Sequence, residues 1–141
     1  MNIITKSEQE TENFAKEIGE KLKGDEIIAL YGDLGVGKTA FTRGLVSCFG
    51  TKNAVTSPTF TLVNEYTAPK FKIYHFDMYR IKNLEDLEST GFFDYMYKGV
   101  FVIEWSENIE NYLPKKTIKI HIEKNENDSE RIITLKGWDN K

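Results

Sequence analysis

The amino-acid sequence predicts a three-layer α/β domain built on a mixed sheet that includes an antiparallel portion. Short apolar runs of strand length alternate with segments of helical periodicity, a glycine-rich turn joins the first apolar run to a helix, and alternating β-forming residues predict hairpins. With 141 residues, the chain has the length of one ordinary domain with its own core. We therefore expect residues 1–141 to form a single domain.

The first helix is expected at residues 8–23. Ser7 and Glu10 have the spacing of a capping box, which satisfies backbone N–H groups at a helix start. Apolar residues then recur every four positions on one helical face: Phe14, Ile18 and Leu22. Gly24 follows them and predicts the end of this helix.

A buried strand followed by a second helix is expected next. Residues 26–31, with the sequence EIIALY, are apolar almost throughout, which is typical of a strand covered on both faces. A glycine-rich turn leads to residues 38–49, where Phe41 and Leu45 lie on one helical face, and Gly50 predicts the helix end. The chain thus passes from a buried strand through a glycine-rich turn directly into a helix.

The rest of the chain predicts further strands and two short helices. Residues 59–66 and 71–77 are rich in β-forming residues, and the turn at Pro69 between them predicts a hairpin. The remaining elements are two short helices at 84–88 and 92–97, a buried strand at 100–105, and two strands at 117–123 and 131–136 around a polar turn at 125–128.

The composition is that of an ordinary globular protein, with 40% hydrophobic and 29% charged residues. No apolar run approaches the ~20 residues that a membrane-spanning helix needs. Residues 1–20 also lack the basic, apolar and small-residue order of a secretory signal. We therefore expect a cytoplasmic protein with no membrane partner. Cys48 is the single cysteine, so the sequence predicts neither an internal disulfide nor a cysteine metal site.

The charge balance limits the partners that the chain is expected to bind directly. The net charge of -3 argues against a broad basic face that grips nucleic acid, because such affinity comes mainly from Lys and Arg on phosphates. Any link to nucleic acid is therefore expected to be indirect. The arginines are three, Arg43, Arg80 and Arg131, although guanidinium groups are the usual clamps on a transferring phosphoryl group.

Residues 32–39, with the sequence GDLGVGKT, match the G-x-x-x-x-G-K-[ST] pattern of a phosphate-binding loop between a strand and a helix. In such a P-loop the backbone N–H groups face the phosphates, the lysine reaches the outer phosphates and the hydroxyl ligates Mg²⁺. The sequence therefore predicts a P-loop NTPase fold that binds a nucleoside triphosphate with Mg²⁺. The expected nucleotide-binding residues are Asp33, Leu34, Gly35, Val36, Gly37, Lys38 and Thr39.

A P-loop site also needs a carboxylate on the magnesium side, usually at the C-terminal end of a neighbouring strand. Glu104 ends the apolar run VFVIE, and Asp77 ends the alternating run IYHFD. Glu104 is the better candidate for the metal because its strand is uniformly apolar. The alternative for both carboxylates is a structural role, in which they cap helices or pair with lysines.

One further segment and two single residues have side chains that suit ligand contacts or structural roles. Ser57, Pro58 and Thr59 follow the P-loop helix, where switch segments of P-loop proteins approach the γ-phosphate, although a plain loop fits the spacing equally. Trp105 is a candidate for stacking on a ligand or partner, with core packing as the alternative. His75 is expected to have a structural role, because no second histidine or cysteine lies at ligand spacing.

Four segments together resemble the TsaE (YjeE) family, the small ATPases of bacterial tRNA threonylcarbamoyladenosine synthesis. They are GDLGVGKTAFTRG at 32–44, SPTFTLVNEY at 57–66, YHFDMYR at 74–80 and IEW at 103–105. The P-loop alone is generic, but the four segments in this order in a chain of this length are specific. Ala40 and Met78 are mild variants of the pattern, and neither removes a chemical group that the motifs require.

The resemblance implies that the chain binds and slowly hydrolyses ATP beside the TsaD and TsaB proteins, which attach threonylcarbamoyl to adenosine next to the anticodon of tRNA. It would drive that cycle and reach tRNA through the complex. The family's phosphate and magnesium residues correspond to Lys38 and Thr39, and its two acidic residues to Asp77 and Glu104, so Lys38, Asp77 and Glu104 are the expected catalytic residues. The family's N-terminal segment also approaches the nucleotide, which makes Glu8 a candidate.

Three other functions are alternatives to an ATPase of tRNA modification. A P-loop GTPase should carry an N/T-K-x-D motif that reads guanine, and the sequence has no such tetrapeptide. A small-molecule kinase would add an acceptor pocket with several arginines and a lid, which three arginines furnish poorly. A nucleotide-gated binding module, in which hydrolysis is incidental, overlaps with the family's behaviour.

Overall fold

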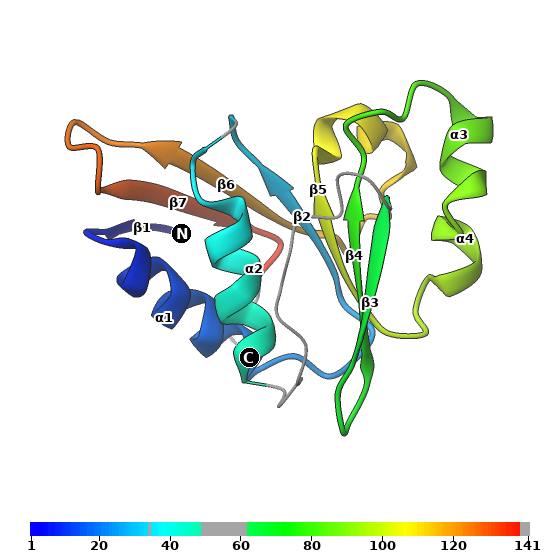
Figure 1. Ribbon diagram of the computed structural model, residues 1–141, viewed down its shortest axis with the longest axis horizontal. Coiled ribbons are helices and arrows are strands. Elements are labelled where there is room, and N and C mark those ends of the chain that lie inside the picture. The colour runs from blue at the N-terminus through cyan, green and yellow to red at the C-terminus, as the bar shows by residue number, and fades with distance from the viewer. Residues whose placement is uncertain (34, 49–61, 139–141) are drawn as a thin grey trace.

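The computed structural model describes residues 1–33, 35–48 and 62–138, and Figure 1 shows their arrangement. Their strands form one seven-stranded mixed sheet in the order β1-β7-β6-β2-β5-β4-β3. The strands are β1 (Asn2–Thr5), β2 (Ile27–Tyr31), β3 (Val63–Thr67), β4 (Lys72–Asp77), β5 (Val100–Glu104), β6 (Ile118–Lys124) and β7 (Arg131–Lys136). β2 pairs in parallel with β5 and β6, and β4 in parallel with β5. The other three pairs, β1–β7, β6–β7 and β3–β4, are antiparallel, which confirms the predicted mixed sheet.

Helices cover both faces of this sheet and complete the three layers. They are α1 (Glu8–Gly19), α2 (Lys38–Ser47), α3 (Leu84–Ser89), α4 (Phe92–Tyr95) and the 3₁₀ helix η1 (Ser106–Tyr112). Figure 1 shows α1 and α2 side by side in front of the sheet, and α3 and α4 beyond β3 and β4. Within the described part of the chain, no helix combines the length and the apolar character needed to cross a membrane.

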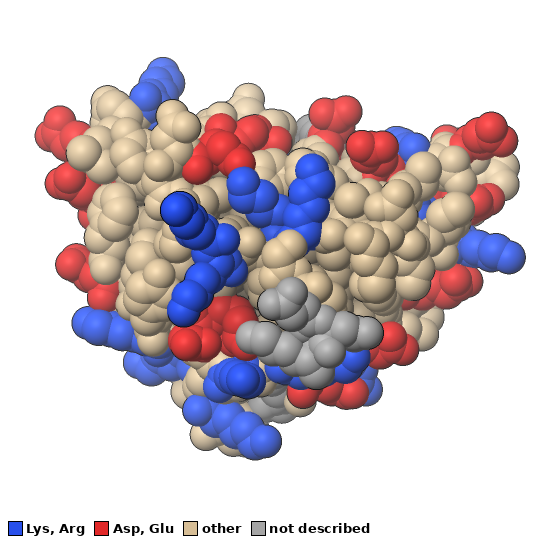
Figure 2. Space-filling model, turned by 180° about the vertical axis from the view of Figure 1, so that it is seen from behind, with Lys and Arg blue, Asp and Glu red and all other residues tan. Residues whose placement is uncertain are grey.

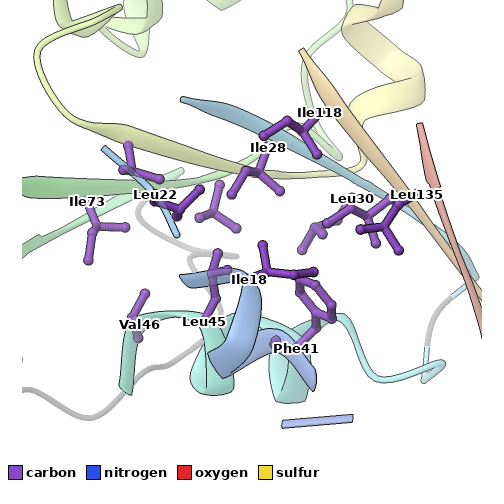
Figure 3. Close-up of a cluster of buried hydrophobic side chains, with 14 of the residues drawn as sticks. Ile18, Leu22, Ile28, Leu30, Phe41, Leu45, Val46, Ile73, Ile118 and Leu135 are labelled. Atoms are coloured by element: carbon purple, nitrogen blue, oxygen red, sulfur yellow. The ribbon is translucent and has the colours of Figure 1, made fainter. Parts of the chain in front are cut away.

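The central strands are buried on both sides because their side chains alternate between two hydrophobic cores. In β2, Ile28 and Leu30 pack with the side chains of α1 and α2, as Figure 3 shows. Ile27 joins the second core, which also holds Leu87 of α3 and Phe92 of α4. Every residue of β2 and β5 is buried. Such burial explains why both strands appear in the sequence as continuous apolar runs.

Two helices end earlier than the sequence predicted. α1 begins with the expected cap, since Glu10 N donates to Ser7 Oγ at 3.1 Å, but it ends at Gly19 instead of residue 23. After Gly19 the chain tightens into i→i+3 hydrogen bonds such as Lys21 N to Ile18 O at 3.0 Å. α2 ends at Ser47, and the rest of the predicted helix falls partly outside the described residues.

Sequence patterns missed two elements, β1 and η1. β1 has four residues and pairs with β7 at the edge of the sheet, so its sequence NIIT is too short to show a period. η1 starts after Trp105, whose φ of 58° is left-handed, and its sequence SENIENY is largely polar. Both elements are held by tertiary contacts rather than by local propensity.

η1 is tied to the sheet through a carboxylate. Glu110 of η1 accepts hydrogen bonds from Tyr31 of β2 and Lys119 of β6. The Tyr31 ring also stacks on His121, with centroids 4.5 Å apart. The hydrogen bond from Lys119, followed by that from Tyr31, lowers the pKa of Glu110 below its ordinary 4.5. Burial raises the pKa of Tyr31, and its hydrogen bond to Glu110 raises this pKa further.

α1 and α2 approach each other closely at Gly44 of α2. A Cβ built at Gly44 would lie 2.7 Å from Cα of Glu12 in α1, which is too close for two carbon atoms. Substituting Gly44→Ala therefore has to push the helices apart. Overpacking of this kind costs about 1–3 kcal/mol, and the gain in helix propensity of about 1 kcal/mol offsets only part of it. We expect a lower urea midpoint at unchanged slope.

The matched control for Gly44→Ala is Ser47→Ala, an exposed position on the same helix. It should change stability by less than about 0.5 kcal/mol. Equal midpoints for the two variants would show that α1 adjusts freely and that the close approach is not a constraint.

The lowered pKa of Glu110 predicts how stability depends on pH. A carboxylate with a depressed folded pKa stabilises the fold above its unfolded pKa, and this contribution disappears as the pH falls through the folded value. Glu110→Gln should therefore unfold at a lower temperature than the wild type at pH 7, and the difference should shrink as the pH falls below the ordinary carboxyl pKa of 4.5. A thermal unfolding series from pH 7 to pH 3 measures it. A constant difference at every pH would assign the effect to packing.

Candidate functional site

Residues 32–39 connect β2 to α2 in a loop that depends on glycine. Gly35 and Gly37 have φ values of 83° and 104°, a region that other residues rarely adopt. Among the described residues, a Cβ at either position would meet nothing within 4 Å, so the backbone conformation requires glycine there. Gly37 is the N-cap of α2 and has no side chain to cap it. The first N–H groups of α2 are therefore left for an anion.

Lys38 is buried in this loop, with only 5% of its surface exposed. Its Nζ donates to the carbonyl of Gly32 at 2.7 Å and lies 4.2 Å from the centroid of the Trp105 ring. The carbonyl and the aromatic face both stabilise a cation. The positive charge thus sits at the loop, at the head of a helix whose dipole also favours anions.

Asp77 and Glu104 lie next to each other at the ends of two parallel strands. They are register partners in the β4–β5 pair, and each is only 5% exposed. Asp77 Oδ1 accepts a hydrogen bond from Tyr79 N at 2.9 Å, and Met78 N donates to Glu104 O at 3.0 Å. A backbone N–H therefore holds the Asp77 carboxylate, and a backbone hydrogen bond ties the end of β5 to the chain after Asp77. Both carboxylates lie at the same edge of the sheet as the P-loop.

One cavity of about 630 Å³ brings most of the predicted residues together. Its size is within the ~300–1,000 Å³ of small-molecule sites. The predicted residues that line it are Glu8, Gly35, Val36, Gly37, Lys38, Thr39, Asp77, Glu104 and Trp105. Asp33 does not line it and instead borders a separate hollow with Glu123 and Lys124. Leu34, Ser57, Pro58 and Thr59 lie outside the described residues.

The cavity wall also contains residues that sequence reasoning did not select: Thr11, Ala40, Arg43, Asp128, Ser129 and Arg131. Arg131 Nε donates to Val36 O at 2.8 Å, which fastens the β6–β7 turn to the P-loop. Arg43 forms ion pairs with Glu8 and Glu12. The β6–β7 turn itself was predicted, but only the strand order could have placed it at the cavity, because β6 lies beside β2 and their C-terminal ends share one edge.

The oxygen ligands at the cavity suit a magnesium ion that arrives with phosphate. Among the described residues, no group of three or more His, Cys, Asp or Glu side chains could hold a metal ion alone. Mg²⁺ does not need such a cage, since it commonly binds through one or two carboxylates with substrate phosphates and water. Thr39, Asp77 and Glu104 offer a hydroxyl and two carboxylates on one cavity, so the residues fit the ion.

The chain resembles known proteins in its family pattern and its sequence. Residues 5–133 match the family model described as "Threonylcarbamoyl adenosine biosynthesis protein TsaE". The chain is 42% identical over 131 residues to the tRNA threonylcarbamoyladenosine biosynthesis protein TsaE of Rickettsia typhi, covering 92% of this chain and 90% of that one. It is 37% identical over 138 residues to the protein of the same name from Bacillus subtilis, covering 97% and 85%.

A solved structure supports the same relationship. The crystal structure of Bacillus subtilis YdiB superposes with a TM-score of 0.80 at 33% sequence identity, covering 96% of this chain and 83% of that one. The likeness confirms the α/β fold. Because the family model spans most of the chain and the relatives match along nearly their whole length, the chain belongs to the TsaE family.

Proposed function

We propose that the chain is a magnesium-dependent ATPase required for forming threonylcarbamoyladenosine next to the anticodon of tRNA. The observation that carries the proposal is that Lys38, Thr39, Asp77 and Glu104 border one cavity at the start of α2. The family's printed description, threonylcarbamoyl adenosine biosynthesis, supplies the process. Residues 1–141 act as a single ATPase domain in this proposal.

Each part of the cavity has a distinct role in the proposal. Backbone N–H groups of residues 33–39 and Nζ of Lys38 would bind the phosphates, and Thr39 and Glu104 would hold Mg²⁺, which would supply charge to neutralise them. Asp77 lies beside Glu104 and would orient the attacking water or act on the magnesium side of the site. Buried carboxylates on paired strands stay fixed, so little reorganisation is needed when ATP binds.

The nucleoside end of ATP is assigned to the part of the cavity formed by α1 and the β6–β7 turn. Glu8, Thr11 and Ser129 supply carboxylate and hydroxyl groups there, and such groups suit the ribose hydroxyls and the adenine amino group. Arg131 holds this turn against the P-loop. The two ends of the nucleotide site are thereby coupled through one side chain.

TsaD and TsaB proteins are the proposed partners, and tRNA is reached through their complex in the cytoplasm. On the face seen in Figure 2, basic and acidic side chains are interspersed, which suits protein contacts better than a continuous grip on nucleic acid. A small-molecule kinase is disfavoured, because Arg43 and Arg131 are engaged by carboxylates and carbonyls of their own chain.

A nucleotide-gated binding module is the second candidate, and the position of Lys38 favours it. Its Nζ is held by Gly32 O and the Trp105 ring, and phosphates would compete with both contacts. Nucleotide binding would then change the surroundings of Trp105. A ligand shifts a conformation only through such differences in contact.

The first prediction from this proposal concerns the rate of ATP hydrolysis. The purified chain should hydrolyse ATP slowly, and addition of the TsaD and TsaB proteins of the same organism should raise the rate. A phosphate-release assay with and without the partners measures this. Tight ATP binding with negligible turnover in both conditions would instead favour the nucleotide-gated module.

A second prediction separates binding from hydrolysis. Lys38→Ala removes a charge-assisted contact to phosphate worth about 1.5–3 kcal/mol, so ATP affinity should fall at least about tenfold. Asp77→Asn and Glu104→Gln keep the shape of the side chain but remove its charge, and should lower turnover by about 100-fold or more with a smaller effect on affinity. Affinity is measured with a fluorescent ATP analogue.

The control for these variants is Lys82→Ala, an exposed lysine that does not line the cavity. It should leave affinity and turnover unchanged. Wild-type turnover in Glu104→Gln would exclude Glu104 from the magnesium site.

A further inference from the structure

His75 is a completely buried histidine that lies two residues before Asp77 on β4. Its Nε2 is 2.6 Å from Oε2 of Glu104, and the two side chains have 0% and 7% exposure. The remaining ring nitrogen, Nδ1, is buried and has no hydrogen-bond partner among the residues that the structure describes. Among the described residues, the polar contact of this imidazole is therefore the one that its Nε2 makes with Glu104.

The direction of this hydrogen bond follows from the acceptor. A carboxylate that binds a cation is ionised and only accepts hydrogen bonds, so in the proposed magnesium site Nε2 of His75 carries the proton and donates to Glu104. Hydrogen bonds to charged acceptors are short and strong, in keeping with the 2.6 Å separation. An apolar side chain would fill the same buried position without leaving Nδ1 unpaired, so packing alone does not account for a histidine here.

Strand register determines which part of Glu104 the histidine holds. His75 is paired with Val102, and Asp77 with Glu104, in parallel strands. Residues two apart on a strand share a face, so the His75 side chain lies on the same face of the sheet as Glu104. It contacts Glu104 diagonally across the two strands, from a position two residues closer to their N-terminal ends. It engages Oε2 there, while the Glu104 side chain borders the cavity. Because this hydrogen bond engages Oε2, Oε1 is the oxygen that the proposal below assigns to the cavity side.

We propose that His75 is a positioning residue, which holds the Glu104 carboxylate so that one oxygen is presented to the magnesium ion bound with ATP. The inference rests on the proposed magnesium-dependent ATP site and extends it to a residue that does not border the cavity. Metal-binding side chains are commonly oriented by hydrogen bonds from behind, and loss of such a partner typically weakens metal binding about 10–100-fold.

The chain offers a matched pair of substitutions at this position. In His75→Gln, the amide nitrogen can occupy the place of the imidazole Nε2 and donate to Glu104. In His75→Asn, the amide is too short, reaching only the place of Nδ1, so the hydrogen bond is lost while a polar amide remains. His75→Leu, which has no donor and fills the buried space with apolar atoms, provides a second loss variant if His75→Asn does not fold.

The experiment measures the dissociation constant of a fluorescent, non-hydrolysable ATP analogue in EDTA and across a Mg²⁺ titration. The wild type and His75→Gln should reach half of the Mg²⁺-dependent gain in affinity at similar Mg²⁺ concentrations. His75→Asn and His75→Leu should need about 10–100-fold more Mg²⁺, with binding in EDTA unchanged. Thermal unfolding in EDTA confirms that each variant is folded.

The possible outcomes separate this inference from the function on which it rests. If a folded loss variant needs no more Mg²⁺ than the wild type, or if His75→Gln is impaired as much as His75→Leu, the positioning role is overturned. If affinity falls equally in EDTA and in Mg²⁺, His75 is only structural and the inference also fails. If Mg²⁺ does not change the affinity of the wild type itself, the proposed magnesium site is at fault.

Discussion

The structure depends above all on the requirement that parallel strands be covered on both faces. β2, β5 and β4 run side by side in parallel, and each divides its side chains between two cores. Such strands need helices on both sides and finish at one common edge. The P-loop follows β2, Glu104 ends β5 and Asp77 ends β4, so the architecture that buries the apolar residues also gathers the polar ones.

The opposite wall of the cavity has a different origin, in the antiparallel half of the sheet. β6 lies beside β2, so the turn that leads into β7 emerges next to the P-loop. Arg131 completes this contact through the carbonyl of Val36. On the remaining side, the close approach of α1 at Gly44 brings Glu8 and Thr11 to the cavity. Long-range packing thus supplies the cavity walls that the P-loop motif does not itself contain.

The contrast between local sequence motifs and long-range packing explains how much of the fold and the site the sequence could predict. The P-loop and the strand-end carboxylates Asp77 and Glu104 carry local signals, namely a spaced motif and polar residues after apolar runs, and their elements were predicted to within a few residues. The strand order, β1, η1 and the place of the β6–β7 turn beside the P-loop carry no local signal, because distant parts of the chain hold them in place. His75 was expected to be structural, but its pairing with Glu104 depends on a register that one sequence does not specify.

Lys38 links the buried phosphate site to a pair of aromatic side chains, the second of which is exposed at the surface. A buried ammonium must be compensated, and here the Gly32 carbonyl and the Trp105 ring do this. Trp105 has a left-handed φ of 58° and contacts Tyr79, whose ring centroid is 4.9 Å away and which is 58% exposed. Under the proposed function, bound phosphates attract Nζ of Lys38 and weaken its contact with the Trp105 ring. The Tyr79 ring, which contacts Trp105, is exposed to solvent. A partner that contacts Tyr79 would therefore meet a surface that differs between the free and ATP-bound chain, because the lysine that binds phosphate also supports the tryptophan beneath that surface.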